Sequence, residues 1–595
     1  MQRKEQESYI DEQRLSEADK ALVEKIYDRL RIWKDGCKEM HERAHIAREV
    51  LLLKDPEQDE PNAKNKTLQL QTLVSTFNNC VADQMDNVME AVMTPEVPEL
   101  QGMVDDINDI VRFVYDRNEY LHYHRMRVQD YLSVGTHICE VCWDEDMANG
   151  EGDIRLLRVP VENFLWDPLE ADIQDSRAVM KVSWHPLSWY KEHYPEKGKY
   201  VESDKNSDYA VGKNNSHDFI ADDEDIAMLV EYWYREYDAD KRRYKINLAR
   251  VAGNALLEKL ENVYEHGMYP FVIDVYTEVE GMPVGEGLVM QLAPMMRYIN
   301  RYAKYMDANI RASAKQKYMV NGAANLDMKA LTDWDEELVL GDRIDDASLR
   351  AFPAPQLSPL ALNQMIQMQT DLKQDSGQNQ FSRGETAGGV TAASAIASLQ
   401  EAGGKQTRMR TETLKRGFKR ITEMILWLIS QYYDEGRVMM ITGKDDTVKQ
   451  VDMSPSRLMG KKKGKVFPPP PYTVRVNVQR MNPATVAAQN QLYIDIYKMS
   501  AEAGQNFPLS ALIRMLNVDG KDRALPIVDA VEQQTQMMQQ LAAENEQLKQ
   551  VTQQQQASID GMKQLINQQA VQNTSQPKTA TGEGMGMNQA APVVV

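Results

Sequence analysis

Cysteine is scarce in this sequence, with four residues in a chain of 595. Four thiols are too few to cross-link a chain of this length, and they are typical of a protein made in a reducing compartment. The sequence has no run of about 18 apolar residues, and its start, MQRKEQESYIDEQ, lacks the apolar core of a signal peptide. We therefore expect neither membrane insertion nor secretion, and a protein that acts in a cytoplasm or in a particle assembled there.

Positive charge is also in deficit, because 69 lysines and arginines face 89 aspartates and glutamates, a formal net charge of −20. A protein that binds nucleic acid over a broad surface releases counterions and is usually basic, so tight and extensive binding to DNA or RNA is not predicted. The charge is compatible with DNA contact at a few basic positions, and also with a purely solubilising role.

Two catalytic signatures bear on whether the chain is an enzyme. The sequence contains no GxxxxGK[ST] phosphate-binding loop, so the chain is not expected to hydrolyse ATP itself. It does contain an HExxH motif at 41–45, which on a helix could bind zinc with Glu42 as the general base of a peptidase. Arg43 would place a cation beside the metal, and the longer metzincin pattern does not continue downstream. A zinc metallopeptidase therefore stays an alternative, and no cofactor or metal is expected.

Cys139 and Cys142 form a CxxC pair within THICEVCWD. This run alternates as a strand does, and residues three apart in a strand point to opposite faces. No second cysteine pair is present to complete a zinc site. The two thiols are predicted to be structural.

The length of the chain exceeds one ordinary hydrophobic core, and 42% hydrophobic residues suffice to bury several subdomains. Up to about residue 285 the sequence mixes helical with strand-like patterns, which predicts an α+β fold, mainly helical. The expected helices are 16–53, 68–93 and 104–132, and the expected strands are 137–143, 178–184, 228–236, 244–250 and 271–277.

Two further helical segments enclose a short segment with turn signals. The first, 288–315, has apolar residues at helical spacing, and Pro294 comes early enough to be tolerated as a kink. The segment 316–355 has turns and strand-like runs, and a second helix begins after Ser358-Pro359. A helix, a small β insert and a returning helix are typical of a spike that projects from a body.

The rest of the chain begins with small residues bracketed by glycine, FSRGETAGGVTAASAIASLQEAGG at 381–404. A long amphipathic helix at 407–433, a strand at 472–478 and helices at 483–503, 509–516 and 525–530 are expected to follow. The glutamine-rich stretch 531–570 has a partial heptad pattern, with Val531 at position a, interrupted by polar residues such as Asn545. It is either a helix that packs against copies of itself or a solvated polar helix.

This order of segments resembles the portal proteins of tailed double-stranded DNA bacteriophages. The run FLWDPLEADIQDSRA at 164–178 is similar to the W-D-P-x-A segment of the portal wing, with Ala171 one residue late. The resemblance covers roughly residues 32–529. It implies a portal fold with a wing (1–285 and 405–482), stem helices (286–315 and 356–378), a clip (316–355), a tunnel loop and helix (379–404) and a crown (483–530), extended by a helical barrel (531–572) and a disordered tail (573–595).

The resemblance implies a non-enzymatic ring, a dodecamer, at one vertex of the capsid of the virion, assembled in the cytoplasm of a bacterial host. Double-stranded DNA would pass through its channel without sequence recognition during packaging and ejection. The ring would dock the terminase large subunit and later the head-tail adaptor proteins, and would contact the major capsid protein and the scaffolding protein. A coiled-coil scaffold or adaptor of the virion is the second alternative.

The same resemblance supplies candidate site residues. In a ring each lysine becomes a ring of charge, so a few cations suffice to contact DNA. The candidates that would face the channel are Arg297, Arg301, Lys304, Arg311 and Lys315 on the first stem helix, and Arg383, Lys405 and Arg408 beside the tunnel loop. The candidates for partner binding on the clip are Trp334, Asp342, Arg343 and Phe352.

Overall fold

The structure is a computed structural model that describes residues 16–54, 69–204, 207–212, 225–239, 242–253, 255–314, 318–320, 325–332, 338, 340–342, 349–351, 359–378, 405–433, 437–442, 448–459, 470–480, 483–502, 508–516, 518 and 521–573. Of the described residues, 58% are helical and the rest include several sheets, which confirms the predicted α+β class, mainly helical. The chain divides into two compact units, Met1–Ala488 and Gln489–Val595.

The first unit begins with the long helix α2, Glu17–Leu51. Ser16 caps it, because its Oγ accepts a hydrogen bond from the backbone N–H of Asp19 at 3.2 Å. Val23, Ile26 and Leu30 follow at helical spacing and are buried. The predicted helix 16–53 is therefore confirmed, and its apolar stripe attaches it to the rest of the unit.

The predicted helix 68–93 is wrong in its second half. Helix α3 spans Thr72–Met85, and strand β1 then runs over Asn87–Pro95. β1 pairs antiparallel with β16, Tyr472–Arg480, from Asn87↔Arg480 to Pro95↔Tyr472. The sequence NVMEAVM fits either period, and the strand is selected by a partner that lies far along the chain.

The predicted helix 104–132 is two helices, α4, Val104–Arg117, and α5, Tyr120–Ser133. The break falls at Glu119, which has a left-handed backbone with φ of +48°. Asn118 closes α4, because its Nδ2 donates to the carbonyl of Val114 at 2.8 Å and to that of Ile154 at 2.9 Å. The side chain of Asn118 thus ties the turn to the neighbouring strand.

Two antiparallel sheets form the β part of this unit. The three-stranded sheet has the order β3-β2-β9 and the five-stranded sheet the order β4-β5-β6-β7-β8. All five predicted strands are present, whereas β3, β4 and β8 were not predicted. The bounds are β2 Thr136–Asp144, β3 Asp153–Val159, β4 Phe164–Trp166, β5 Ala178–Pro186, β6 Ile226–Asp238, β7 Arg243–Ala252, β8 Ala255–Leu260 and β9 Phe271–Val275.

A half-buried lysine joins the two sheets. Lys181 of β5 forms ion pairs with Glu140 of β2 at 2.8 Å and with Glu231 of β6 at 2.5 Å. Burial would lower the pKa of Lys181, but the two carboxylates raise it above its ordinary value. The charge at Lys181 therefore holds the strands of both sheets at one point.

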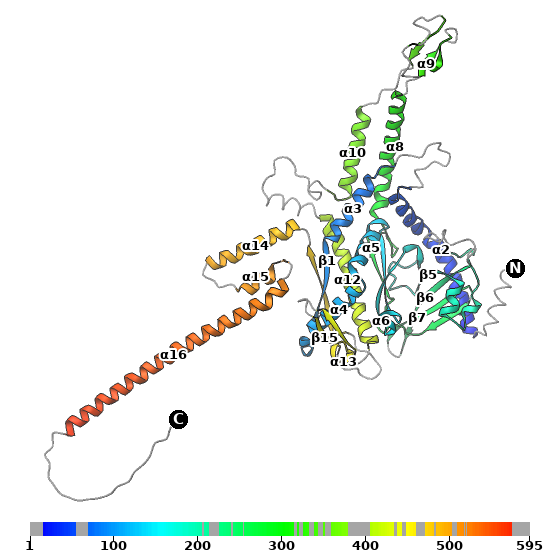
Figure 1. The fold of residues 1–595 in the computed structure, drawn as a ribbon. Helices are drawn as coiled ribbons and strands as arrows, with labels where there is room; N and C mark the ends of the chain where they lie inside the picture. The colour runs from blue at the N-terminus through cyan, green and yellow to red at the C-terminus, as the bar shows by residue number, and fades with distance from the viewer. Residues whose placement is uncertain are drawn as a thin grey trace, which may run out of the picture. The chain divides into compact units, whose positions relative to one another are not determined.

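Helices α8, Leu288–Ala314, and α10, Pro359–Asp375, lie side by side in the first unit (Figure 1). Between them in sequence come β12, Tyr318–Val320, the short helix α9, Met328–Thr332, and β13, Leu349–Ala351. β12 and β13 pair antiparallel, with Met319 opposite Arg350. The predicted pattern of two helices around short strands is therefore present in the described residues.

Helix α12, Lys405–Tyr432, carries the apolar face that the sequence predicted for 407–433. Leu414, Phe418, Ile421 and Ile425 are fully buried in the main core of the unit. The remaining elements are η1 Pro98–Met103, α6 Met147–Gly150, η2 Val161–Asn163, α7 Leu187–His193, η3 Gly198–Tyr200, β10 Thr277–Glu278, β11 Gly285–Glu286, β14 Val438–Thr442, β15 Val448–Asp452 and α13 Pro455–Leu458.

Helix α14, Pro483–Glu502, crosses the boundary between the units, and the second unit continues with α15, Leu509–Met515, and α16, Lys521–Asn573. Ser510 attaches α15 to α16, because its N–H and its Oγ donate to the carboxylate of Glu532 at 3.0 and 2.6 Å. The stretches 525–530 and 531–570, predicted as separate segments, belong to one continuous helix. The residues from 574 onward, expected to form a disordered tail, lie outside the described residues.

Candidate functional site

Four of the five cations predicted to face a channel from the first stem helix lie within the described part of α8. Arg297, Arg301, Lys304 and Arg311 follow one another at intervals of four, three and seven residues. Because these intervals return to the same side of a helix, the four cations share one face. Arg301 and Arg311 are exposed and the other two are half-buried. Sequence periodicity alone would have predicted this shared face.

The core-facing side of α8 is a different one. Leu292, Met296, Ile299 and Ala303 are buried, and by helical spacing they are centred about a third of a turn around the helix from the four cations. The guanidinium carbon of Arg301 lies 5.2 Å from the centre of the Tyr298 ring. This places the charge beside an exposed aromatic ring and keeps it in solvent.

The last of these cations is paired. Arg311 forms an ion pair with Asp307 at 2.7 Å, in which both side chains are largely exposed. Exposed pairs of this kind contribute at most about 1 kcal/mol. A competing phosphate could therefore displace Asp307 at little cost.

A second basic face begins at the start of α12. Lys405 and Arg408 are exposed there, whereas Arg410 points inward and is buried. The exposed face continues in steps of three and four residues, and it includes four cations that sequence analysis did not name. These are Lys415, Arg416, Lys419 and Arg420.

Acidic residues on this face of α12 are few. Lys415 pairs with Glu412 at 3.4 Å and Lys419 with Glu423 at 3.7 Å, and both contacts are within one helical turn. The basic residues outnumber these two carboxylates in a chain whose net charge is −20. The run LKRGFKR was the signal that could have extended the prediction beyond Arg408.

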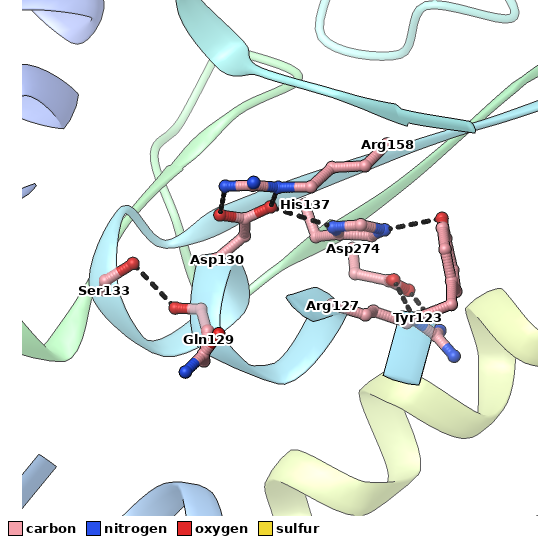
Figure 2. A network of polar contacts seen from close by, with 8 residues as sticks. All are labelled: Tyr123, Arg127, Gln129, Asp130, Ser133, His137, Arg158 and Asp274. Atoms are coloured by element: carbon pink, nitrogen blue, oxygen red, sulfur yellow. Dashed lines mark hydrogen bonds and ion pairs between the residues drawn. The ribbon is translucent and has the colours of Figure 1, made fainter. Parts of the chain in front are cut away.

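Helix α12 is held in place by a buried arginine of α5 (Figure 2). The Nε and Nη2 atoms of Arg127 donate to the two carboxylate oxygens of Asp274, in β9, at 2.6 and 2.9 Å. Nη2 also donates to the carbonyl of Leu414 in α12 at 2.6 Å. Burial would lower the pKa of Arg127, but Asp274 raises it, so the cation persists inside the protein.

The close approach of α12 to this ion pair requires a glycine. A Cβ atom at Gly417 would lie 1.9 Å from Oδ1 of Asp274 and 2.7 Å from Nη2 of Arg127. The backbone of α12 therefore sits directly against the ion pair.

A second buried group fixes α5 on the three-stranded sheet (Figure 2). Arg158 of β3 donates to both oxygens of Asp130 at 2.5 and 2.6 Å. His137 of β2 lies between Asp130, 3.3 Å from its Nδ1, and the hydroxyl of Tyr123, 2.9 Å from its Nε2. Burial raises the pKa of Asp130, but the hydrogen bonds from His137 and Arg158 together bring it below its ordinary value.

The comparison with known families decides the identity of the chain. A sequence profile of the family described as phage P22-like portal protein matches residues 62–581, which is most of the chain. The chain belongs to this family. A search of curated proteins finds no match.

Membership makes the chain a portal vertex protein of a bacteriophage capsid and a structural component of the virion. It implies a homo-oligomeric ring through which viral DNA passes in packaging and ejection. Portal proteins are structural proteins, and neither the peptidase nor the coiled-coil adaptor is supported. In the part of the chain that the structure describes, no helix is both long and apolar enough to cross a membrane.

The HExxH motif of this portal protein lies on α2, as predicted, but its first histidine is engaged elsewhere. Nε2 of His41 lies 3.1 Å from the carbonyl oxygen of Phe164, and its ring meets Trp166 edge-on. Burial lowers the pKa of His41. Arg43, within the motif, pairs with Glu286 at 3.0 Å. Among the described residues, no group of three or more His, Cys, Asp or Glu side chains could hold a metal ion.

Cys139 and Cys142 of the portal protein are free thiols in β2, as predicted for structural cysteines. Burial raises the pKa of Cys139 to about 12 and that of Cys142 as well. The Sγ of Cys142 donates to the carbonyl of Arg155 across the sheet at 3.8 Å. Both thiols therefore stay protonated within strand β2.

One of the four predicted clip residues can be placed in the portal structure. Asp342 is exposed, and its carboxylate accepts a hydrogen bond from Nδ2 of Asn325 at 3.1 Å. Trp334, Arg343 and Phe352 lie outside the described residues, as do the channel candidates Lys315 and Arg383.

Proposed function

We propose that the basic faces of α8 and α12 line the DNA channel of the portal ring. The observation that carries this proposal is that Arg297, Arg301, Lys304 and Arg311 share one face of α8, on which Arg301 and Arg311 are exposed. In a ring, every such residue is repeated around the axis and forms a level of positive charge. Successive levels along α8 would guide the phosphate backbone without reading its sequence.

The acidity of the chain supports a sliding contact. Binding to phosphate strengthens with each cation that releases counterions, so a uniformly basic channel would retain DNA. A net charge of −20, with DNA contacted by the cations of only two helical faces, favours weak and repeated contacts instead. DNA would then move in either direction under the force of the packaging motor or of its own compression.

The parts of the chain take the roles that the family resemblance gives them. We assign the wing to 1–285 and 405–482, the stem to α8 and α10, the clip to 316–355, the tunnel loop and helix to 379–404, and the crown to 483–530. The pairing of β1 with β16 supports a single wing built from both ends of its sequence. Asp342, Trp334, Arg343 and Phe352 would form the clip surface that docks the terminase large subunit and then the head-tail adaptors.

The glutamine-rich stretch 531–572 would extend the crown as a helical barrel in a dodecamer. Along α16, Val531, Met538 and Leu541 are exposed, and Ile559 and Ile566 continue the same heptad positions. A stripe of this kind is stable when neighbouring copies cover it. The ring would assemble in the host cytoplasm with the major capsid protein and the scaffolding protein.

The channel proposal is tested by pairing charge removal with ring assembly. Arg301→Ala with Lys304→Ala should leave rings intact in negative-stain images but reduce the DNA packaged per particle severalfold. Arg155→Ala is a matched control, because Arg155 is half-exposed on the wing and pairs with Asp144 at 2.6 Å. Normal packaging in the double variant, or an equal defect in the control, would remove the support for an α8 channel face.

The tunnel-side candidates have a test of their own. Lys405→Ala with Arg408→Ala should impair packaging or genome retention, because both side chains are exposed at the first turn of α12. If packaging and retention are both unchanged, α12 does not face DNA.

The barrel is tested by truncation before residue 531. Rings of the truncated chain should still form, since wing and stem supply their contacts, and mass photometry gives the subunit number. Loss of rings on truncation would favour assembly through α16 instead.

A further inference from the structure

Helix α3 contacts residues on both sides of the segment 379–404, and these flanking residues are called its two ends. At the first end, Nε2 of Gln378 donates to the carboxylate of Asp83 and lies 3.7 Å from Sγ of Cys80. The thiol of Cys80 in turn donates to the carbonyl of Ser376 at 3.6 Å. The residues just before position 379 are therefore attached to α3.

At the second end, Gln84 of α3 makes the attachment. Nε2 of Gln84 donates to the carbonyl of Thr407 at 3.1 Å. Oε1 of Gln84 accepts a hydrogen bond from the hydroxyl of Thr411 at 3.2 Å. A single glutamine thus uses both its donor and its acceptor on the first two turns of α12.

The two ends are also joined to each other. Nη2 of Arg410 donates to the carbonyl of Ser376 at 2.9 Å, to Oε1 of Gln406 at 3.2 Å and to the hydroxyl of Tyr276 at 3.1 Å. Gly377 has a φ of +85°, and a Cβ there would lie 2.3 Å from Oε1 of Gln406. The end of α10 and the start of α12 are consequently in direct contact.

Most of this polar group is shielded from water. Gln84, Gln378 and Arg410 are each less than 5% exposed, and Cys80 is fully buried. A buried polar atom that loses its partner carries the full cost of its desolvation, so the contacts form and break together. We name Cys80, Asp83, Gln84, Gln378 and Arg410 the α3 clamp.

We propose that the α3 clamp is a positioning site that fixes both ends of 379–404 on one helix, so that the end of α10 and the start of α12 cannot shift independently. The role of that segment at DNA rests on the proposed function, whereas the coupling of its ends does not.

The decisive experiment measures whether a change at one end loosens the other. Gln378→Glu places a second carboxylate against Asp83, and amide hydrogen exchange of assembled rings is followed at pH 8, where the repulsion is greatest. Exchange in 405–411 should accelerate by about tenfold or more, although Gln378 belongs to the other end. Acceleration confined to 372–378 would overturn the clamp.

A second substitution provides the rescue that a general packing defect would not give. Adding Asp83→Asn to Gln378→Glu restores a donor and an acceptor with their roles exchanged, and exchange in 405–411 should return toward that of the unchanged protein. Asn79→Asp is the matched control, because Asn79 is exposed on α3 and should have no effect. Failure of the rescue would count against the clamp.

If the Gln378→Glu chain does not assemble, Gln84→Met gives the same information without added charge. It removes the bonds to Thr407 and Thr411 while keeping the length of the side chain, and it should accelerate exchange in 372–378. No change there would overturn the clamp. DNA retention by Gln378→Glu particles separates the two proposals, because coupled exchange with normal retention supports the clamp and counts against the tunnel assignment of 379–404.

Discussion

Arg127 and Asp274 form an ion pair whose side chains are 0% and 1% exposed, joined by two hydrogen bonds of 2.6 and 2.9 Å. The pair connects α5 to β9, and the additional bond to Leu414 brings in α12. Three elements from distant parts of the sequence are therefore fixed by one guanidinium. Because α12 also carries a proposed channel face, this ion pair sets the position of that face relative to α5 and β9.

Arg127→Met should be strongly destabilising. The change leaves the charge of Asp274 buried without its partner, which typically costs about 3–5 kcal/mol in the free energy of unfolding. Denaturant unfolding of the purified chain measures this cost. Arg155→Met is the control, since the exposed pair with Asp144 should contribute at most about 1 kcal/mol. Equal losses in the two variants would contradict the structural role of Arg127.

Gly417→Ala should destabilise the protein by about 1–3 kcal/mol, because the added methyl group overlaps Asp274 and Arg127. The matched control is Gly561→Ala in α16, where nothing lies within 4 Å of the new Cβ. There the better helix propensity of alanine should stabilise α16 by up to about 1 kcal/mol. Opposite shifts in thermal unfolding are expected, and a neutral Gly417→Ala would show that α12 can move away from the ion pair.

Acid should destabilise the chain through His124. Burial lowers the pKa of His124 from 6.5 to about 3, and neither of its ring nitrogens has a hydrogen-bond partner among the described residues. A pKa depressed by folding gives stability that is fully present above 6.5 and is lost as the pH falls toward the folded pKa. This single group should reduce the free energy of unfolding by about 2 kcal/mol between pH 7 and pH 5.

His124→Phe tests the assignment, because phenylalanine keeps the stacking on Tyr120 and removes the titrating group. The variant should lose less stability on acidification than the unchanged chain, as measured by urea unfolding at both pH values. An unaltered pH dependence would assign the acid sensitivity to other groups, such as His266, whose pKa burial lowers to about 4.

The reactivity of the four cysteine thiols should report unfolding of the chain. Burial raises the pKa of Cys37 and that of Cys139 to about 12, and raises that of Cys80 as well. A chromogenic disulfide reagent should therefore react with these three only as the chain unfolds, whereas Cys142, whose pKa burial also raises but whose side chain is partly exposed, should react slowly and before them. Cys142→Ser should abolish the early phase. Rapid reaction of more than one thiol in the folded protein would contradict the burial of this core.

The sequence was most informative where the pattern is local. The apolar spacing of α8 and the Ser358-Pro359 start of α10 predicted both helices, whereas the shared face of the four cations of α8 was not predicted. Local signals also located α12, although the basic residues beyond Arg408 were overlooked. These features depend only on neighbours within a few turns of a helix.

The features that sequence reasoning missed depend on distant partners. Residues 87–93 were predicted to be helical. The strand that pairs with them begins at Tyr472, and no local pattern indicates a partner so far along the chain. Gln84 and Arg410 carry no motif, and their role follows from contacts such as Gln84 with Thr411, 327 residues apart. The zinc alternative, which Arg43 and the missing downstream pattern already disfavoured, is not supported, and His41 instead contacts the carbonyl of Phe164, 123 residues away.

The pairing of β1 with β16 has a consequence for synthesis. Pro95 leaves the ribosome long before Arg480, so β1 stays unpaired while residues 96–471 are translated. At about 5–20 residues per second this wait is roughly 20–80 s. An unpaired strand edge exposed for that time invites pairing with other chains. Yield of soluble portal should consequently depend on chaperones and on translation rate more than on the stability of the finished subunit.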